Sequence, residues 1–179
     1  MNAQDILSRY YDTDTELYRI LKAHSEDVTG KALQIARMHA EMNLDTGFIE
    51  EAAMLHDIGI FLCDAPDIYC RGKAAYICHG YLGADLVRRE GYPLHALVCE
   101  RHTGAGLSAV EIAARNLPLP VRDMLPVSGE ERLICFADKF FSKTRLGKEK
   151  SVDRITQGLS RYGDEQVARF RALCKLFLG

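Results

Sequence analysis

The stretch EAAMLHDIGIF, residues 51–61, carries the strongest signal in this sequence. It begins as an apolar, helix-like run and then places His56 and Asp57 next to each other, where a core helix normally continues with aliphatic residues. Adjacent helical positions diverge by about 100°, so both side chains serve one site only if something lies between their two directions. A metal ion fits that requirement.

Further candidate ligands stand in or at the end of other apolar helical segments. A lone histidine on an apolar stripe is usually a packed core residue, so each of them says little when taken alone. Together, four imidazoles and two carboxylates from five segments can hold one or two divalent ions, because imidazole suits Fe, Mn, Ni or Zn and carboxylate can bridge. The complete set is His24, His56, Asp57, His79, His102 and Asp138.

The composition excludes several classes of protein. The formal net charge of −2 gives no general attraction to nucleic acid or to an anionic membrane. The N-terminal residues lack a basic segment followed by an apolar one, and no run approaches the length that crosses a bilayer. The six cysteines form no CxxC pair, which argues against structural zinc and favours free thiols. We expect a cytoplasmic protein with no membrane contact and no long nucleic acid partner.

Helical periodicity dominates the chain, and no alternating strand pattern is present. We expect an all-α protein that forms a single domain over residues 1–179, because a chain of this length buries a sizeable core and shows no dividing linker. The predicted helices cover residues 3–10, 14–41 with a break near His24, 47–57, 74–90, 94–103, 108–115, 129–144, 150–161 and 164–177.

Local signals refine this outline. Ser128 followed by Glu131 predicts a capping box at the start of a helix. Gly59 is expected to let the chain leave its helix in a conformation that other residues disfavour. The GYP sequence at 91–93 predicts a turn between helices. An aromatic cluster at helical spacing favours core packing over stacking on a base, and it consists of Phe136, Phe140 and Phe141.

The order His24, His56-Asp57 and Asp138, with the pair continuing as HDIG, resembles the HD superfamily of metal-dependent phosphohydrolases. An HD pair alone is unspecific, whereas the ordered set in an all-α chain is fairly specific. The resemblance spans about residues 20–145 and leaves the C-terminal helices, at 150–177, outside it. It implies a single HD-type helical bundle.

The resemblance extends to two more histidines. Family members with two extra histidines between the HD pair and the final aspartate often hold two metals, commonly iron, and His79 and His102 fill those places. The local sequences HGYLGADLV and RHTGAGL are similar to the branch that includes symmetrical diadenosine tetraphosphate hydrolases. The resemblance then implies that Asp57 bridges two ions, that His79 and His102 complete one site, and that the other site is completed by His24, His56 and Asp138.

The family also implies a reaction. We expect hydrolysis of a phosphoester or phosphoanhydride of a nucleotide or dinucleotide polyphosphate, with a metal-bridged hydroxide as nucleophile and Asp57 as the catalytic residue. Two ions about 3.5–4 Å apart can stabilise both the attacking and the leaving oxygen of an in-line displacement. Iron is the expected metal, with Mn, Ni, Mg and Zn as alternatives. A homodimer is compatible with this expectation.

A basic stretch directly after Asp138, ADKFFSKTRLGKEK, offers partners for phosphate. Lys139 and Lys143 are spaced i, i+4, which places them on one face of the expected helix. Ser142 and Arg101 are further candidates. The alternative is a solvated basic helix end, which the helix dipole favours.

Three other functions stay open. A mononuclear HD nucleotidase uses the H…HD…D ligands alone, a di-iron HD-fold oxygenase uses O₂ instead of water, and a nucleotide-sensing module binds without turnover. The basic stretch favours a phosphorylated ligand, and an intact ligand set argues against a pure sensor. The GYP sequence does not indicate a cyclic-dinucleotide phosphodiesterase, because it precedes His102 instead of following a double histidine.

Overall fold

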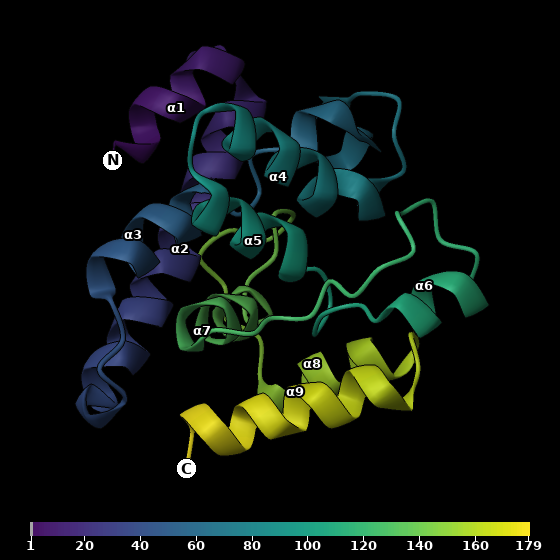
Figure 1. The fold of residues 1–179 in the computed structure, drawn as a ribbon. Coiled ribbons are helices and arrows are strands. Elements are labelled where there is room, and N and C mark those ends of the chain that lie inside the picture. The colour runs from purple at the N-terminus through teal and green to yellow at the C-terminus, as the bar shows by residue number, and fades with distance from the viewer. Residues whose placement is uncertain (1) are drawn as a thin grey trace.

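The structure, a computed structural model, describes residues 2–179 and is built almost entirely from helices (Figure 1). The α-helices assigned within these residues are α1 Ala3–Tyr10, α2 Glu16–Met38, α3 Thr46–Leu55, α4 His79–Arg89, α5 Pro93–Arg101, α6 Ala109–Ala114, α7 Gly129–Asp138, α8 Val152–Ser160 and α9 Asp164–Phe177. Short 3₁₀ helices lie between them at Ala40–Met42, Ile60–Leu62, Pro66–Ile68 and Tyr76–Cys78. The predicted all-α class is confirmed.

A minimal antiparallel sheet lies between α3 and α4. Strands β1 Asp64–Ala65 and β2 Cys70–Arg71 pair with Ala65 opposite Cys70. The sequence pattern did not reveal these strands, because two residues are too short to show an alternation of apolar and polar side chains.

Several helices end earlier than predicted, and the ends of α3 and α7 matter for the site. α3 stops at Leu55, so His56 and Asp57 lie in the turn that follows the helix and not within it. α7 stops at Asp138 instead of continuing to residue 144, and the N–H of Lys139 turns back to the carbonyls of Phe136 and Ala137. Helix periodicity continued past both positions in the sequence, and only the local hydrogen bonds end the helices.

The predicted break near His24 is absent from the described chain. α2 runs without interruption from Glu16 to Met38 and buries an apolar stripe on both sides of this residue. Leu21 and Val28 flank it on the buried face, and both are fully buried. His24 is therefore held in mid-helix by packing in the turns before and after it.

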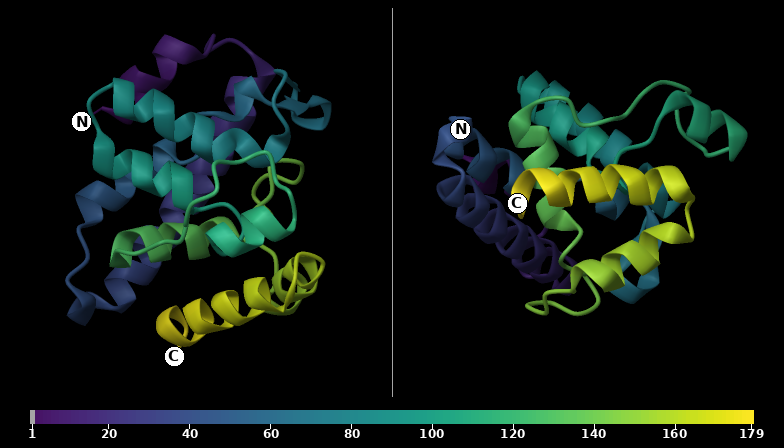
Figure 2. Two further views of the ribbon diagram at one scale, coloured as in Figure 1. Left: turned by 45° about the vertical axis from the view of Figure 1, so that its right-hand side comes forward. Right: turned by 90° about the horizontal axis from the view of Figure 1, so that it is seen from below.

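The helices form a bundle with α7 near its centre. α2 packs along α3 on one side, α4 and α5 form a pair on another, and α9 lies against α7. Figure 1 shows α4 and α5 above α7, with α8 and α9 below it, and the two views of Figure 2 show α8 and α9 as a helical hairpin along one side of the bundle. The GYP sequence forms the connection between α4 and α5, as predicted.

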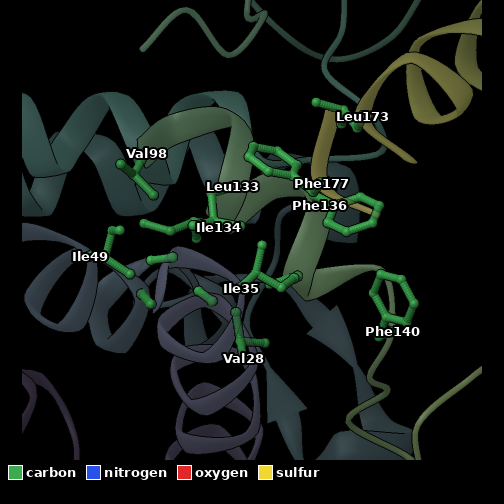
Figure 3. Close-up of a cluster of buried hydrophobic side chains, with 14 of the residues drawn as sticks. Val28, Ile35, Ile49, Val98, Leu133, Ile134, Phe136, Phe140, Leu173 and Phe177 are labelled. Carbon is green, nitrogen blue, oxygen red and sulfur yellow. The ribbon is translucent and has the colours of Figure 1, made fainter. Parts of the chain in front are cut away.

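The largest apolar core joins α7 to the C-terminal hairpin. Phe136 is fully buried at its centre, with its ring centroid 5.7 Å from that of Phe170, 5.5 Å from that of Phe177 and 5.0 Å from that of Phe140 (Figure 3). The predicted core role of Phe136 and Phe140 is confirmed. Phe141 packs against the same core while remaining partly accessible.

The capping box predicted at Ser128 is half formed. Its hydroxyl accepts the N–H of Glu131 at 3.1 Å, but the Glu131 carboxylate accepts from the N–H of Val127 at 2.9 Å instead of reaching back to the cap. A complete box forms at Ser108 and Glu111, at the start of α6.

Glu111 also anchors α9. Its carboxylate lies 2.6 Å from the Arg169 guanidinium and accepts a hydrogen bond from the Gln166 amide at 3.0 Å. Burial favours the neutral acid, but hydrogen bonds from Ser108, Arg169 and Gln166 outweigh it and lower the pKa of Glu111 to about 2. This network ties α6 and α9 to each other.

Gly59 is needed for a close approach of two backbones. Its φ of −83° is ordinary, so the expected special conformation is not observed. A Cβ at this position would lie 2.2 Å from the carbonyl oxygen of His79 and 2.5 Å from the backbone nitrogen of Gly83. The absence of a side chain therefore lets α4, which begins with His79, approach the turn that carries Asp57.

The described residues contain no disulfide, and their cysteines are free thiols. Across the part of the chain that the structure describes, none of the helices is both long and apolar enough to span a membrane.

Replacing Gly59 by alanine is expected to destabilise the protein. Inserting a methyl group into a packed backbone contact typically costs about 1–3 kcal/mol. We expect urea unfolding to give a lower midpoint for Gly59→Ala. Gly30→Ala is the matched control, because a Cβ there meets nothing within 4 Å, and in a helix it adds up to about 1 kcal/mol of stability. Equal midpoints for the two variants would contradict the close-approach role.

The Glu111 network is expected to make stability depend on acid pH. The folded pKa of about 2 lies below the ordinary value of 4.5, so the unfolded chain binds the proton first. The contribution is complete above about pH 4.5 and is lost as the pH falls toward 2. Unfolding free energies measured across this window should fall less steeply for Glu111→Gln than for the wild-type protein, and parallel curves would refute the assignment.

Candidate metal centre

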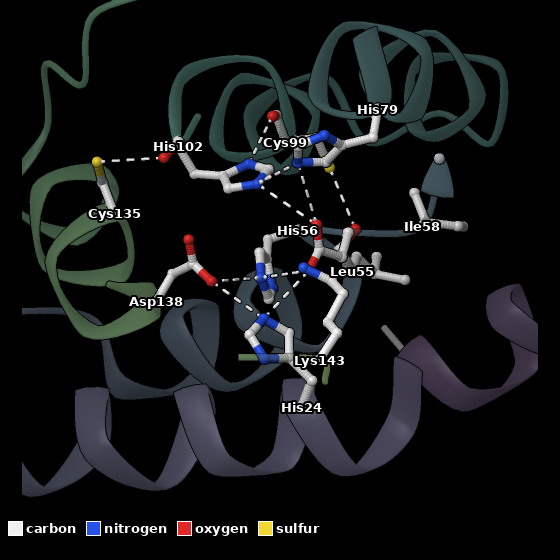
Figure 4. A network of polar contacts seen from close by, with 12 residues as sticks. His24, Leu55, His56, Ile58, His79, Cys99, His102, Cys135, Asp138 and Lys143 are labelled. Atoms are coloured by element: carbon white, nitrogen blue, oxygen red, sulfur yellow. Dashed lines mark hydrogen bonds and ion pairs between the residues drawn. The ribbon is translucent and has the colours of Figure 1, made fainter. Parts of the chain in front are cut away.

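The predicted ligands meet at the ends of several helices (Figure 4). Only His24 stands inside a helix. His56 caps the C-terminus of α3 and is followed by Asp57, His102 caps the C-terminus of α5, His79 opens α4 and Asp138 ends α7. Their donor atoms fall into two groups, each with all atoms within 4.8 Å of one another, namely His24, His56, Asp57 and Asp138, and Asp57, His79 and His102.

Three of the histidines share one local arrangement. The Nδ1 atoms of His56, His79 and His102 each lie within 2.8 Å of the carbonyl oxygen three residues earlier. A carbonyl can only accept, so each Nδ1 carries the proton and each Nε2 keeps its lone pair. The accepting carbonyls of Ala53, Tyr76 and Cys99 thus orient three imidazoles with Nε2 toward the centre of the cluster.

Asp57 stands between the two groups and offers one oxygen to each. Its Oδ2 lies 3.2 Å from Nε2 of His24 and 3.1 Å from Nε2 of His56. Its Oδ1 lies 3.3 Å from Nε2 of His79 and 3.5 Å from Nε2 of His102. The side chain is fully buried. One carboxylate therefore contacts the histidines of both ligand groups.

The cluster meets the requirements of a cation site. The Nε2 atoms of His79 and His102 face each other at 3.0 Å, and two lone pairs at that distance repel unless a positive charge lies near both. Among the described residues, Nε2 of His56 and Oδ1 of Asp57 are buried without a hydrogen-bond partner, whereas Oδ2 of Asp57 is paired with Lys143. Buried polar atoms are costly when left unpaired, so the donor set fits divalent ions that accept imidazole and carboxylate ligands.

The pKa shifts differ across the cluster, since His56 favours its charged form and His79 its neutral form. Burial opposes protonation of His56, but the carboxylates of Asp57 and Asp138 outweigh it and raise the pKa of His56 to about 9. Burial lowers the pKa of His79 to about 3, against the attraction of Asp57. Despite burial, which favours the neutral acid, Lys143 and His56 hold the pKa of Asp57 well below its ordinary value.

Two lysines of the basic stretch reach the cluster from beyond the end of α7. Lys143 Nζ lies 2.5 Å from Oδ2 of Asp57, and Lys139 Nζ lies 2.7 Å from Oδ2 of Asp138. They do not share a helical face, because the helix ends before them. Lys139 also donates to the carbonyl of His102 at 3.1 Å, which ties it to the structure around the ligands.

A cavity of about 580 Å³ opens onto both ligand groups. Lys143 and Ser142 line it, together with His24, His79, His102 and Asp138. Arg101 is not on this wall, because its guanidinium is paired with the Glu131 carboxylate at 2.9 Å. A phosphate contact from Arg101, as expected from the sequence, would require this ion pair to open.

The cavity also contains residues that the sequence did not single out. Arg115, Leu159, Tyr162 and Gln166 all belong to its wall. They stand outside any motif, and no spacing in the sequence connects them to the ligands. The packing of α6 brings Arg115 there, and the packing of the C-terminal hairpin brings the other three.

A sequence model described as the HD domain matches residues 21–142. The chain belongs to the HD domain family. The match covers α2 to α7 and all six candidate ligands, and it confirms the resemblance seen in the sequence. HD domains are metal-dependent phosphohydrolases, and the His and Asp cluster described above provides donors of the kind that bind divalent ions. The hairpin α8–α9 lies beyond the matched residues.

Two of the three curated relatives described next are about twice as long as this HD protein. A tRNA (cytidine(56)-2′-O)-methyltransferase of Thermoplasma volcanium is 29% identical over 98% of this chain and 46% of its own length. The protein of the same name from Picrophilus torridus is 29% identical over 78% of this chain and 39% of its own. An uncharacterised protein of Methanocaldococcus jannaschii is 32% identical over 63% of this chain and 60% of its own. The chain thus spans between about two fifths and three fifths of these relatives, and no solved structure matches it.

Elemental analysis of the HD protein purified without chelator is expected to find two metal ions per chain. Because His79 and His102 serve only one of the two groups, His79→Ala and His102→Ala should each lower the content toward one. His39→Ala is the control, since this histidine contacts the carbonyl of Phe177 far from the cluster. One ion per chain, unaffected by either substitution, would contradict a second metal group.

Proposed function

We propose that this protein is a phosphohydrolase that uses two divalent metal ions to cleave a phosphoester or phosphoanhydride of a nucleotide or dinucleotide polyphosphate. The observation that carries the proposal is the buried carboxylate of Asp57, which turns one oxygen to His24 and His56 and the other to His79 and His102. Membership of the HD family supports the reaction class.

In this proposal the side chains divide the work by position. His24, His56 and Asp138 hold one ion, His79 and His102 hold the other, and Asp57 serves both. When bound, such ions act as Lewis acids that lower the pKa of water and neutralise charge on phosphoryl oxygens. Iron remains the metal that we expect, with Mn, Ni, Mg or Zn as alternatives, because the donor set of imidazole and carboxylate suits these ions.

Lys143 is the proposed phosphate partner. Its ammonium group lines the cavity and lies beside Asp57, where a substrate phosphate near the ions would also lie. Burial favours the neutral amine, but the carboxylate of Asp57 outweighs it and raises the pKa of Lys143, so the group stays charged. Ser142 stands on the same wall, and its hydroxyl lies 3.0 Å from that of Thr144. Lys139 has the supporting role of holding Asp138 and the His102 carbonyl.

The cavity supports a substrate larger than inorganic phosphate. Pockets of about 300–1,000 Å³ suit small organic ligands, and this one has a volume of about 580 Å³. Its wall combines the cation of Lys143 with apolar side chains such as Leu107 and Leu159. A nucleotide matches that combination of a charged and an apolar part.

The geometry of the cluster favours the proposed function over a mononuclear nucleotidase and over a di-iron oxygenase. A mononuclear nucleotidase has no use for the oriented pair His79 and His102, whose Nδ1 atoms are held by carbonyls in the same way as that of His56. A di-iron oxygenase shares the ligand set, and Lys143 on the cavity wall favours a substrate that carries phosphate. We also propose that residues 1–179 form one domain, since the largest core joins α7 to the C-terminal hairpin.

The names of two relatives favour a second candidate substrate. Both are called tRNA methyltransferases, and the second candidate substrate is therefore a phosphate at the end of an RNA chain. The net charge of −2 supports a small substrate over a long RNA. Including a short oligoribonucleotide with a terminal phosphate in the substrate screen separates the two.

Cleavage of nucleotides and dinucleotide polyphosphates, measured as released phosphate or as product nucleotides, is expected for the wild-type protein. Asp57→Ala should abolish it, because the substitution removes the ligand common to both groups. Lys143→Met should lower kcat/KM by about 10²-fold, the usual effect of removing one group that stabilises a transition state. Lys148→Ala is the matched control, because Lys148 is exposed on the same basic stretch. Near-normal turnover by Asp57→Ala, with helix content unchanged in circular dichroism, would refute the proposal.

A further inference from the structure

The lining of the cavity falls into two chemical sets. One set consists of the candidate ligands and Lys143. The other consists of apolar and aromatic side chains and one arginine, and its members come mainly from the connection after His102, from the end of α6 and from the C-terminal hairpin. The proposed function accounts for the first set and leaves the second without a role. The second set includes Leu107, Arg115, Leu159 and Tyr162.

Tyr162 and Arg115 form the most exposed part of this second set. Tyr162 stands in the turn between α8 and α9 and is 55% exposed. Arg115 caps the C-terminus of α6, and its guanidinium carbon lies 5.5 Å from the centroid of the Tyr162 ring. A phenol ring and a guanidinium plane are the two side-chain groups on which nucleobases commonly stack.

The hairpin that carries Tyr162 is fixed relative to the ligands. The side-chain amide of Gln166, 1% exposed, accepts from the N–H of Ala105 and donates to the carbonyl of Gly106, both at 2.7 Å. The guanidinium of Arg169 donates to the carbonyl oxygens of Ala105 and Gly106. These contacts hold α9 against the loop that directly follows His102, and Figure 1 shows the α8–α9 end of the hairpin below α6.

We propose that Tyr162 and Arg115, with Leu107 and Leu159 beside them, form a nucleobase subsite for a nucleotide whose phosphate lies at Lys143. This inference rests on the proposed function and names the part of the substrate that the C-terminal hairpin recognises. Leu159, Tyr162 and Gln166 lie outside the residues matched by the HD domain, so membership of the family does not assign this role to them.

The subsite holds a base by its face and not by its edge. Gln166, the amide on this wall, already uses its oxygen on Ala105 and its two N–H groups on Gly106 and Glu111. Stacking on an aromatic ring tolerates all bases, because every base has a π-face. We therefore expect adenine, guanine, cytosine and uracil nucleotides to bind with similar affinities.

Equilibrium dialysis of the full chain, supplied with Mn²⁺, tests the subsite with two probes, AMP and ribose 5-phosphate, which differ by the base alone. The wild-type protein is expected to bind AMP about tenfold more tightly, as one stacked base typically provides. Tyr162→Ala should remove this preference, and Tyr162→Phe should keep it because the ring remains. Released phosphate is measured in the same samples, so that hydrolysis is recognised.

Tyr69→Ala serves as the matched control, since Tyr69 is 54% exposed and lines a different pocket. The subsite is refuted if wild-type protein binds the two probes equally, if it binds neither, or if Tyr162→Ala keeps the preference for AMP. Phosphate release without a preference for AMP would support the proposed phosphohydrolase activity and refute the nucleobase subsite. A preference for AMP that depends on Tyr162, without hydrolysis of any phosphate compound, would support the nucleobase subsite and refute the phosphohydrolase activity.

Discussion

The side chains of the candidate metal centre are arranged around one buried carboxylate. Asp57 is fully buried, and its two oxygens face four imidazole nitrogens at 3.1–3.5 Å. An ionised group in such a position is stable only when positive charge is close by, because burial removes the water that would otherwise solvate it. Lys143 provides part of that positive charge. The donor atoms around Asp57 suit divalent ions, which would provide the remaining positive charge.

The bundle is organised so that helix ends meet at this carboxylate. His56 caps the C-terminus of α3, His102 caps that of α5, α7 ends at Asp138 and α4 begins at His79. Unpaired carbonyls at a helix C-terminus carry partial negative charge, which favours cations nearby. The same carbonyls accept the Nδ1 protons of the histidines, so one feature of helix geometry both orients the ligands and adds to the field that attracts metal.

The C-terminal hairpin adds a second layer to the HD domain. It lies outside the matched residues, yet it shares a core with α7 through Phe136, Phe170 and Phe177. It also holds the loop after His102 through Gln166 and Arg169. The matched part thus contains the candidate ligands, whereas the proposed contacts to the remainder of the substrate come partly from residues that the family does not prescribe.

The sequence by itself determined the helical class, the family and the six candidate ligands. Helical periodicity is a local property, and the HD family requires particular residue types in a particular order. The helical class and the candidate ligands can therefore both be recognised in the sequence. Phe136 and Phe140 were assigned to the core for the same reason, since helical spacing reports burial.

Only the tertiary structure decided where side chains that follow no periodic pattern would go. Arg101 pairs with Glu131 instead of facing the cavity, because Glu131 comes from a helix distant in sequence. Gly59 makes room for the carbonyl of His79 and does not adopt an unusual φ. Tyr162 reaches the cavity because α9 is fastened to the loop at Ala105. Each of these outcomes depends on distances between segments far apart in the chain, and such distances are set by packing and not by local sequence.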